Sequence, residues 1–264
     1  MASNLSTIGF VFADEIAFRD TMIACAADTG LQLPCAAGHY GIWRSRRGAE
    51  SWFHLGRSHS GEVEIFGLTP FFEGKSDITL QLTQRISRDT DNGFEGAFHG
   101  YFGAGAGDPG DAIPIVFDAV DFAARTTVPL PAVRHVRLTA FTRELTAHVN
   151  EGAYFEAQRK AVEQPQLAAK AFIPVGLFAP EESGIEAGGD PLAPVPASTA
   201  IFTGKVIEHN RLTNGATGHA FEWMLVETLD ATIDVLADPA IVKGEIVEGG
   251  TIEASALLFG RLLD

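Results

Sequence analysis

The stretch ITLQLTQRISRDTDNGFEGAFHGYF, residues 78–102, decides the fold class of this 264-residue chain. Residues 78–86 alternate between apolar and polar side chains, which is the period-two pattern of a strand with one buried face. The pair Asn92-Gly93 then favours a tight turn, because both residues readily adopt positive φ angles. Phenylalanines recur on one face beyond this turn. The stretch therefore predicts an antiparallel hairpin with an apolar face that another element has to cover.

Helices are predicted on either side of this hairpin along the chain. Residues 14–28 carry apolar side chains at helical spacing, with Asp14 suited to cap the first turn and Gly30 to end the helix. A second helix is expected to begin after Asn150. We expect the first helix to cover the apolar face of the hairpin, because it is the nearest amphipathic element.

The composition of the chain predicts two domains. Residues 1–180 are expected to form an N-terminal α+β domain with an antiparallel sheet and flanking helices, including a strand over residues 135–142. Residues 181–198, EESGIEAGGDPLAPVPAS, are dense in Gly and Pro and predict a linker. Residues 199–264 read as about four or five short strands, which have to close on themselves to remove exposed edges. The expected fold class is thus β-rich α+β, with a small C-terminal barrel of OB-like or SH3-like type.

The charge balance limits the partners that the protein can have. Lys and Arg number 19 against 34 Asp and Glu, which gives a formal net charge of −15. A chain this acidic is repelled by phosphate backbones and by anionic membranes, so nucleic acid is an unlikely partner. Cys25 and Cys35 have no metal or redox spacing and are expected to be buried free thiols. We find no secretory signal and no membrane span in the sequence, and expect a cytoplasmic protein without a cofactor.

The dense basic run of the chain is Trp43-Arg44-Ser45-Arg46-Arg47. Arginine side chains can hold an anion through paired N–H donors, and a neighbouring tryptophan can add a stacking face. Arg44 and Arg46 are therefore candidate ligand-binding residues. The alternative is that both arginines form the solvent face of a hairpin that ends at residues 47–48.

Four histidines fall in the predicted N-terminal sheet, and they are His39, His54, His59 and His99. His54 and His59 are five residues apart, so they face opposite sides of one continuous strand. A turn at Gly56 would bring the two together, which makes both of them candidate ligand-binding residues. None of the histidines has the spacing of a metal motif, and we expect no metal. The alternative is that these side chains make ordinary structural hydrogen bonds.

Glycines, aromatic residues and strand ends recur in a spread-out pattern that resembles uncharacterised bacterial proteins of unknown function. The pattern consists of GAESWF (48–53), GLTPFFEG (67–74), FTGKV (202–206) and LFGR (258–261). These positions are structural in character. The resemblance therefore implies no catalytic residue and no function.

Two classes of function follow from these observations. The first is a non-enzymatic binding or regulatory protein, which takes a protein partner or a small molecule and could act as a homodimer. The second is a hydrolase-like enzyme that acts on a small anionic substrate in a pocket lined by Arg44, Arg46, His54 and His59. The second class requires these side chains to converge in one pocket with shifted pKa values.

Overall fold

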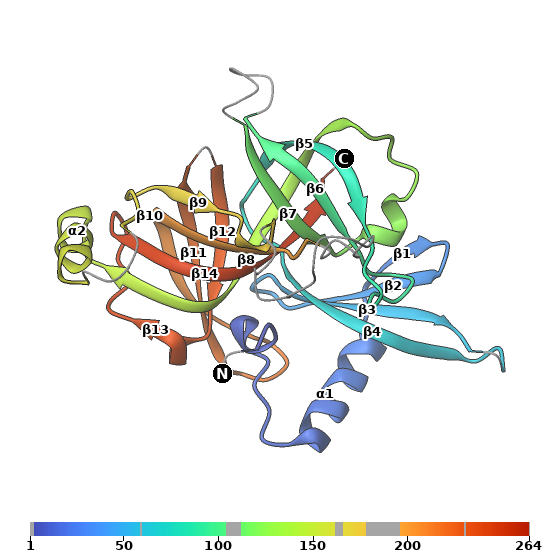
Figure 1. Cartoon of the computed structure of the whole chain (residues 1–264). Helices are drawn as coiled ribbons and strands as arrows, with labels where there is room; N and C mark the ends of the chain where they lie inside the picture. The colour runs from blue at the N-terminus through green and yellow to red at the C-terminus, as the bar shows by residue number, and fades with distance from the viewer. Residues whose placement is uncertain are drawn as a thin grey trace, which may run out of the picture.

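The computed structural model describes residues 3–58, 60–103, 112–161, 166–177, 196–229 and 231–263. Over these residues the protein has two α-helices, a four-stranded antiparallel sheet and a ten-stranded mixed sheet (Figure 1). The predicted β-rich α+β class is confirmed to this extent. The predicted linker falls largely outside the described residues, since only 196–198 of it are described.

The smaller sheet is an antiparallel meander in which each strand pairs with the next one along the chain. Its strands are β1 (Leu31–Cys35), β2 (Gly38–Arg44), β3 (Ala49–Arg57) and β4 (Val63–Phe72). A tight turn joins β2 to β3, where the Ser45 N–H donates to the Ala49 carbonyl. Gly48 has a φ of 89° in this turn, a conformation that glycine adopts without a steric penalty.

The larger sheet contains strands from both halves of the chain. They are β5 (Ile78–Ile86), β6 (Ala97–Phe102), β7 (Ile113–Ala119), β8 (Ala132–His148), β9 (Ala171–Ile173), β10 (Thr199–Thr213), β11 (Ala220–Thr228), β12 (Ala231–Ala237), β13 (Val242–Lys243) and β14 (Thr251–Leu262). The antiparallel pairing predicted over residues 78–102 is confirmed, since β5 and β6 pair in antiparallel register. The predicted tight turn at Asn92-Gly93 is wrong, because residues 87–96 join the two strands and Gly93 does not adopt a positive φ.

The first half of this sheet is a Greek key. Strands β5, β6 and β7 are consecutive antiparallel neighbours, and β8 returns to pair with the other edge of β5. The last strand, β14, then pairs with β7 in parallel and with β8 in antiparallel register. The pairings of these five strands therefore form a closed circuit.

The second half forms another circuit that uses the same two strands. Antiparallel pairing runs from β12 through β11 and β10 to β14, and β8 lies between β12 and β14. The sequence had suggested that the strands of residues 199–264 close on themselves. In the structure they do not. Their circuit is completed by β8, which is 17 residues long and can pair with β5 near its start and with β12 further on.

The helices lie outside both sheets. Helix α1 (Glu15–Ala27) is capped by Asp14, whose Oδ1 accepts the Ala17 N–H at 2.8 Å, and α2 (Glu151–Lys160) is capped by Asn150 in the same way. Both predicted helices are confirmed. Short 3₁₀ helices are η1 (Ser6–Ile8), η3 (Phe122–Arg125), η4 (Val175–Leu177) and η5 (Pro239–Ile241).

We had expected helix α1 to cover the hairpin of β5 and β6, but it does not. It packs against β2, and of its residues only Met22 and Cys25 are buried. The apolar face of the hairpin packs inside the first circuit, where Leu80, Leu82 and Phe98 are fully buried together. Side chains from other strands of the larger sheet supply the cover that the sequence had assigned to the helix.

A second core joins the smaller sheet to the larger one. Trp52, Phe53 and Phe71 of the smaller sheet share it with Phe141 and Phe221 of the larger. These aromatic side chains are almost completely buried. Burial of this kind is the main favourable contribution to folding, so the two sheets are held together through an apolar contact. The site described below lies at the edge of this contact.

Candidate functional site

The basic run found in the sequence forms the end of β2 and the turn that follows. We call residues 44–47 the arginine turn. Arg44 is the last residue of β2 and pairs in register with Glu50 on β3. Arg44, Arg46 and Arg47 are exposed, whereas Ser45 is buried. The hairpin interpretation of this run is therefore correct for the backbone.

The guanidinium of Arg44 is engaged by two glutamates. It donates to Glu50, whose side chain is fully buried, and its Nη2 lies 2.9 Å from Glu73 Oε2. The second oxygen of Glu50 accepts the indole N–H of Trp52 at 2.7 Å. Arg44 is thus neutralised within the protein, which makes it a structural residue.

Glu73 is the centre of a larger group of ion pairs. It also binds Arg137 from β8, and Arg261 from β14 lies with its Nη2 2.5 Å from Glu73 Oε2. Burial lowers the pKa of both Arg137 and Arg261. Arginines that are largely withdrawn from water need such partners. The group therefore ties the smaller sheet to the two strands that the circuits share.

A buried carboxylate, Asp234 on β12, lies next to this group. Its Oδ1 accepts the Lys75 N–H at 3.1 Å and the Trp223 indole N–H at 2.8 Å, and its Oδ2 accepts the Ser76 N–H at 2.8 Å. Burial raises the pKa of Asp234, while the three donors and Arg137 act in the opposite direction. Asp234 therefore anchors the segment after β4 to the larger sheet.

His54 is also a structural residue. Asn92 Nδ2 lies 3.2 Å from His54 Nδ1, and since the amide nitrogen is a donor, Nδ1 accepts and the ring carries its proton on Nε2. That nitrogen lies 3.1 Å from Thr69 Oγ1, and the ring stacks on Phe94. Burial lowers the pKa of His54 to about 4. The imidazole is thus neutral, enclosed and fully engaged.

Of the three candidate residues that the structure describes, Arg44 and Arg46 line the same cavities and His54 does not. His54 lies two positions beyond Trp52 on β3, packed against Tyr40 and Phe94, whereas Arg44 binds the glutamates. His59 lies outside the described residues.

The other two histidines that we considered are also separated. His39 is on β2 in the smaller sheet, and His99 is on β6 in the larger sheet, where its Nδ1 lies 2.7 Å from Thr83 Oγ1. Within the described part of the chain, no group of three His, Cys, Asp or Glu side chains could hold a metal ion.

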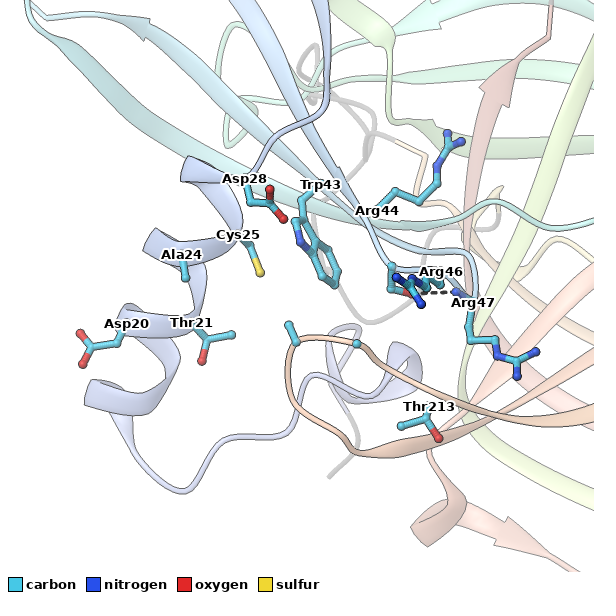
Figure 2. Close-up of a pocket in the computed structure, with 13 residues that line it drawn as sticks. Asp20, Thr21, Ala24, Cys25, Asp28, Trp43, Arg44, Arg46, Arg47 and Thr213 are labelled. Carbon is cyan, nitrogen blue, oxygen red and sulfur yellow. Dashed lines mark hydrogen bonds between the residues drawn. The ribbon is translucent and has the colours of Figure 1, made fainter.

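A large cavity lies on one side of the arginine turn. This helix-side cavity has a volume of about 930 Å³ and lies between α1, the arginine turn and the turn that joins β10 to β11 (Figure 2). Its lining residues are Asp20, Thr21, Ala24, Cys25, Asp28, Trp43, Arg44, Ser45, Arg46, Arg47, Thr213, Gly215 and Ala216. A volume of this size accommodates a small molecule.

A second, smaller cavity lies on the other side of the same turn. This sheet-side cavity has a volume of about 420 Å³ and shares the four residues of the arginine turn with the first. Lys75 also lines it, with its ammonium group 5.3 Å from the centre of the Trp223 ring and 2.5 Å from Glu208. The arginine turn thus separates two cavities and contributes to the walls of both.

Arg46 and Arg47 differ from the other cations of this region. Within the described residues, neither guanidinium has an ion-pair partner or a side-chain hydrogen bond. The sequence placed Arg47 in the same basic run as Arg44 and Arg46, all three of which can hold an anion by residue type, but only Arg44 and Arg46 were candidate ligand-binding residues.

No protein-family model, curated protein or solved structure matches this chain. The resemblance to uncharacterised bacterial proteins therefore stays an expectation from the sequence. Within the part of the chain that the structure describes, no helix combines the length and apolar character that crossing a membrane requires.

Proposed function

We propose that this protein is a non-enzymatic binding protein that takes a small anionic molecule at the arginine turn. The observation that carries this proposal is the pair Arg46 and Arg47. Both guanidinium groups line the two cavities and have no carboxylate partner among the described residues. The chain has 34 acidic residues and 19 basic ones, yet none of the described carboxylates pairs with these two cations beside the cavities.

The chemistry of the two side chains supports an anionic ligand. A guanidinium presents a planar set of N–H donors that matches the oxygens of carboxylates and phosphates in pairs. Two such groups side by side add their positive charges at one place on the surface. Two adjacent arginines therefore favour a ligand with a carboxylate, phosphate or sulfate group.

The alternative, a hydrolase-like enzyme, has less support. It required Arg44, Arg46, His54 and His59 to line one pocket. Arg44 is bound by Glu50 and Glu73, and His54 is enclosed among aromatic rings away from both cavities. Because a general base needs to reach its substrate, the position of His54 favours binding over catalysis.

We further propose that the two strand circuits are barrels of OB-like order fused through β8 and β14. The support is a five-stranded pairing that begins with a Greek key in the first circuit. In this view the barrels form the scaffold, and the smaller sheet carries the binding turn at their edge. Barrels of this type bind many kinds of ligand, so the scaffold alone does not select one.

Titration of the full chain with inorganic phosphate at low ionic strength tests the proposed function. We expect binding by isothermal titration calorimetry, weakened about tenfold or more by Arg46→Gln together with Arg47→Gln, since each lost charge-assisted bond is worth over 1 kcal/mol. The control is Arg159→Gln, because Arg159 is an exposed arginine on α2, away from both cavities. Equal affinity in the double variant and the wild type would contradict the proposal.

A further inference from the structure

The walls of the helix-side cavity carry opposite charges. Arg46 and Arg47 lie on the arginine turn, and Asp28 lies across the cavity at the end of α1, with its carboxylate beside Trp43 (Figure 2). Asp20 also lines this cavity, but it pairs with Arg19 at 3.0 Å, and Figure 2 shows its carboxylate pointing away from Trp43. The cavity therefore has one positive and one negative pole.

The position of Asp28 strengthens the negative pole. Asp28 is the C-cap of α1, where its backbone N–H donates to the carbonyls of Ala24 and Cys25. The C-terminal end of a helix already carries a partial negative charge, so a carboxylate there is unfavourable for the helix. The last turn of α1 contains no basic residue that would compensate this negative charge. A ligand with a positively charged group would compensate it.

The surface between the two poles is largely unreactive. Trp43 is mostly buried and presents only part of its ring, and Cys25 is buried beside it. Burial, followed by the charge of Asp28, raises the pKa of the Cys25 thiol to about 11. The thiol therefore stays protonated and serves as an apolar wall. Thr21 and Thr213 add hydroxyl groups at the sides.

We propose that the helix-side cavity binds a zwitterion, whose ammonium group meets Asp28 and whose anionic group meets Arg46 and Arg47. This inference rests on the proposed function, because the anionic end uses the same arginines. The carbon chain or ring of the ligand lies between the poles, against Cys25 and Trp43. The ligand class is thus an amine-bearing carboxylic, phosphoric or sulfonic acid, and a simple anion would fill only half of the site.

A series of matched probes tests this inference on the full chain. The probes are the straight-chain ω-amino acids from glycine to 6-aminohexanoate, each compared with the carboxylate and the amine of the same chain length. We expect at least one amino acid to bind about tenfold more tightly than both of its singly charged analogues, the ratio given by one added charge contact. If no amino acid in the series exceeds its carboxylate analogue, the inference is wrong.

The variant Asp28→Asn assigns the ammonium site. We expect it to reduce the affinity for the preferred amino acid to that of the matched carboxylate, and to leave phosphate binding unchanged or stronger. Asp20→Asn is the matched control and should keep the preference. If Asp28→Asn also keeps the preference, the inference is overturned while the proposed function stands. If neither phosphate nor any carboxylate binds, the proposed function itself fails, and the inference fails with it.

Discussion

Gly74 lies against the carboxylate of Asp234 so closely that a β-carbon at position 74 would stand 2.1 Å from Asp234 Oδ2. The same carboxylate accepts the backbone N–H groups of Lys75 and Ser76, the two residues that follow. The segment after β4 is therefore fastened to β12 by a contact that leaves no room for a side chain. This contact places Glu73 where it meets the arginines of β8 and β14.

Replacing Gly74 by alanine should destabilise the protein. The added methyl group would push Asp234 away from its donors, and overpacking alone costs about 1–3 kcal/mol. The free energy of unfolding, measured by urea denaturation, should fall by at least that amount. Gly30→Ala is the control, because a β-carbon at position 30 would have no atom within 4 Å. If the two variants were equally stable, the close contact between Gly74 and the Asp234 carboxylate would be contradicted.

The variant Glu73→Gln should also lower stability, because it removes the charge that Arg137 and Arg261 share. The side chains of these arginines are 17% and 16% exposed, so they cannot recover full hydration. Breaking a buried ion pair from one side costs about 3–5 kcal/mol, and we expect the lower end because Glu73 is 26% exposed. Asp20→Asn, which breaks the exposed pair with Arg19, should change the unfolding free energy by under about 0.5 kcal/mol. A loss at Glu73 as small as that at Asp20 would disprove a structural role for the group.

Some local features of the fold could be predicted from the sequence because they depend on neighbouring residues. The turn at Asn92-Gly93 and the caps at Asp14 and Asn150 are predicted from the backbone preferences and side-chain lengths of those residues. Both caps are present in the structure, whereas the tight turn is not, because residues 87–96 join β5 to β6 and Gly93 does not adopt a positive φ. Short-range physics therefore fixes where the two helices begin, but it does not fix the connection of this hairpin.

Closure of the strands could not be predicted in this way. The sequence indicated a strand over residues 135–142, whereas β8 spans Ala132–His148 and serves both circuits. Its length beyond the clear alternating pattern is stabilised by pairing with β14, a strand more than a hundred residues away in the chain. Which edges meet depends on packing between distant segments, and periodicity does not contain that information.

The candidate site was predictable only in its local part. The basic run identified Arg44 and Arg46, but Arg44 is bound by Glu73, which lies in the segment after β4. The sequence does not show which arginine is left without a carboxylate partner and is therefore available to a ligand. Asp28 has no motif and is brought to the cavity by the packing of α1 on β2. His54 was selected by residue type, and its burial could be seen only in the structure.

Acid should destabilise the protein through His54. Because burial lowers its folded-state pKa from 6.5 to about 4, the folded state favours the neutral ring. The contribution is fully present above pH 6.5, and it falls as the pH drops towards 4, by about 3 kcal/mol in total. Urea unfolding of wild type and His54→Gln between pH 7 and 4 isolates this contribution as the difference between the two curves.

Two buried carboxyl groups act on both proteins alike. Burial raises the pKa values of Asp121 and Asp234, which has the opposite effect on stability at low pH. The difference between wild type and His54→Gln removes these shared contributions. A difference that does not change with pH would mean that the folded-state pKa of His54 is close to its ordinary value.

Asp28→Asn should make the ligand-free protein more stable. The carboxylate lies at the C-terminal end of α1, where it opposes the helix dipole, and removing its charge should gain about 0.3–1 kcal/mol. We expect a higher melting temperature at low salt and a smaller gain at high salt, because salt screens this interaction. Asp14→Asn is the control with the opposite sign, since Asp14 caps the favourable N-terminal end and its charge helps the helix. A carboxylate that destabilises the free protein is expected where that carboxylate binds a ligand. If Asp28→Asn instead lowered the stability, Asp28 would have a structural role in the fold.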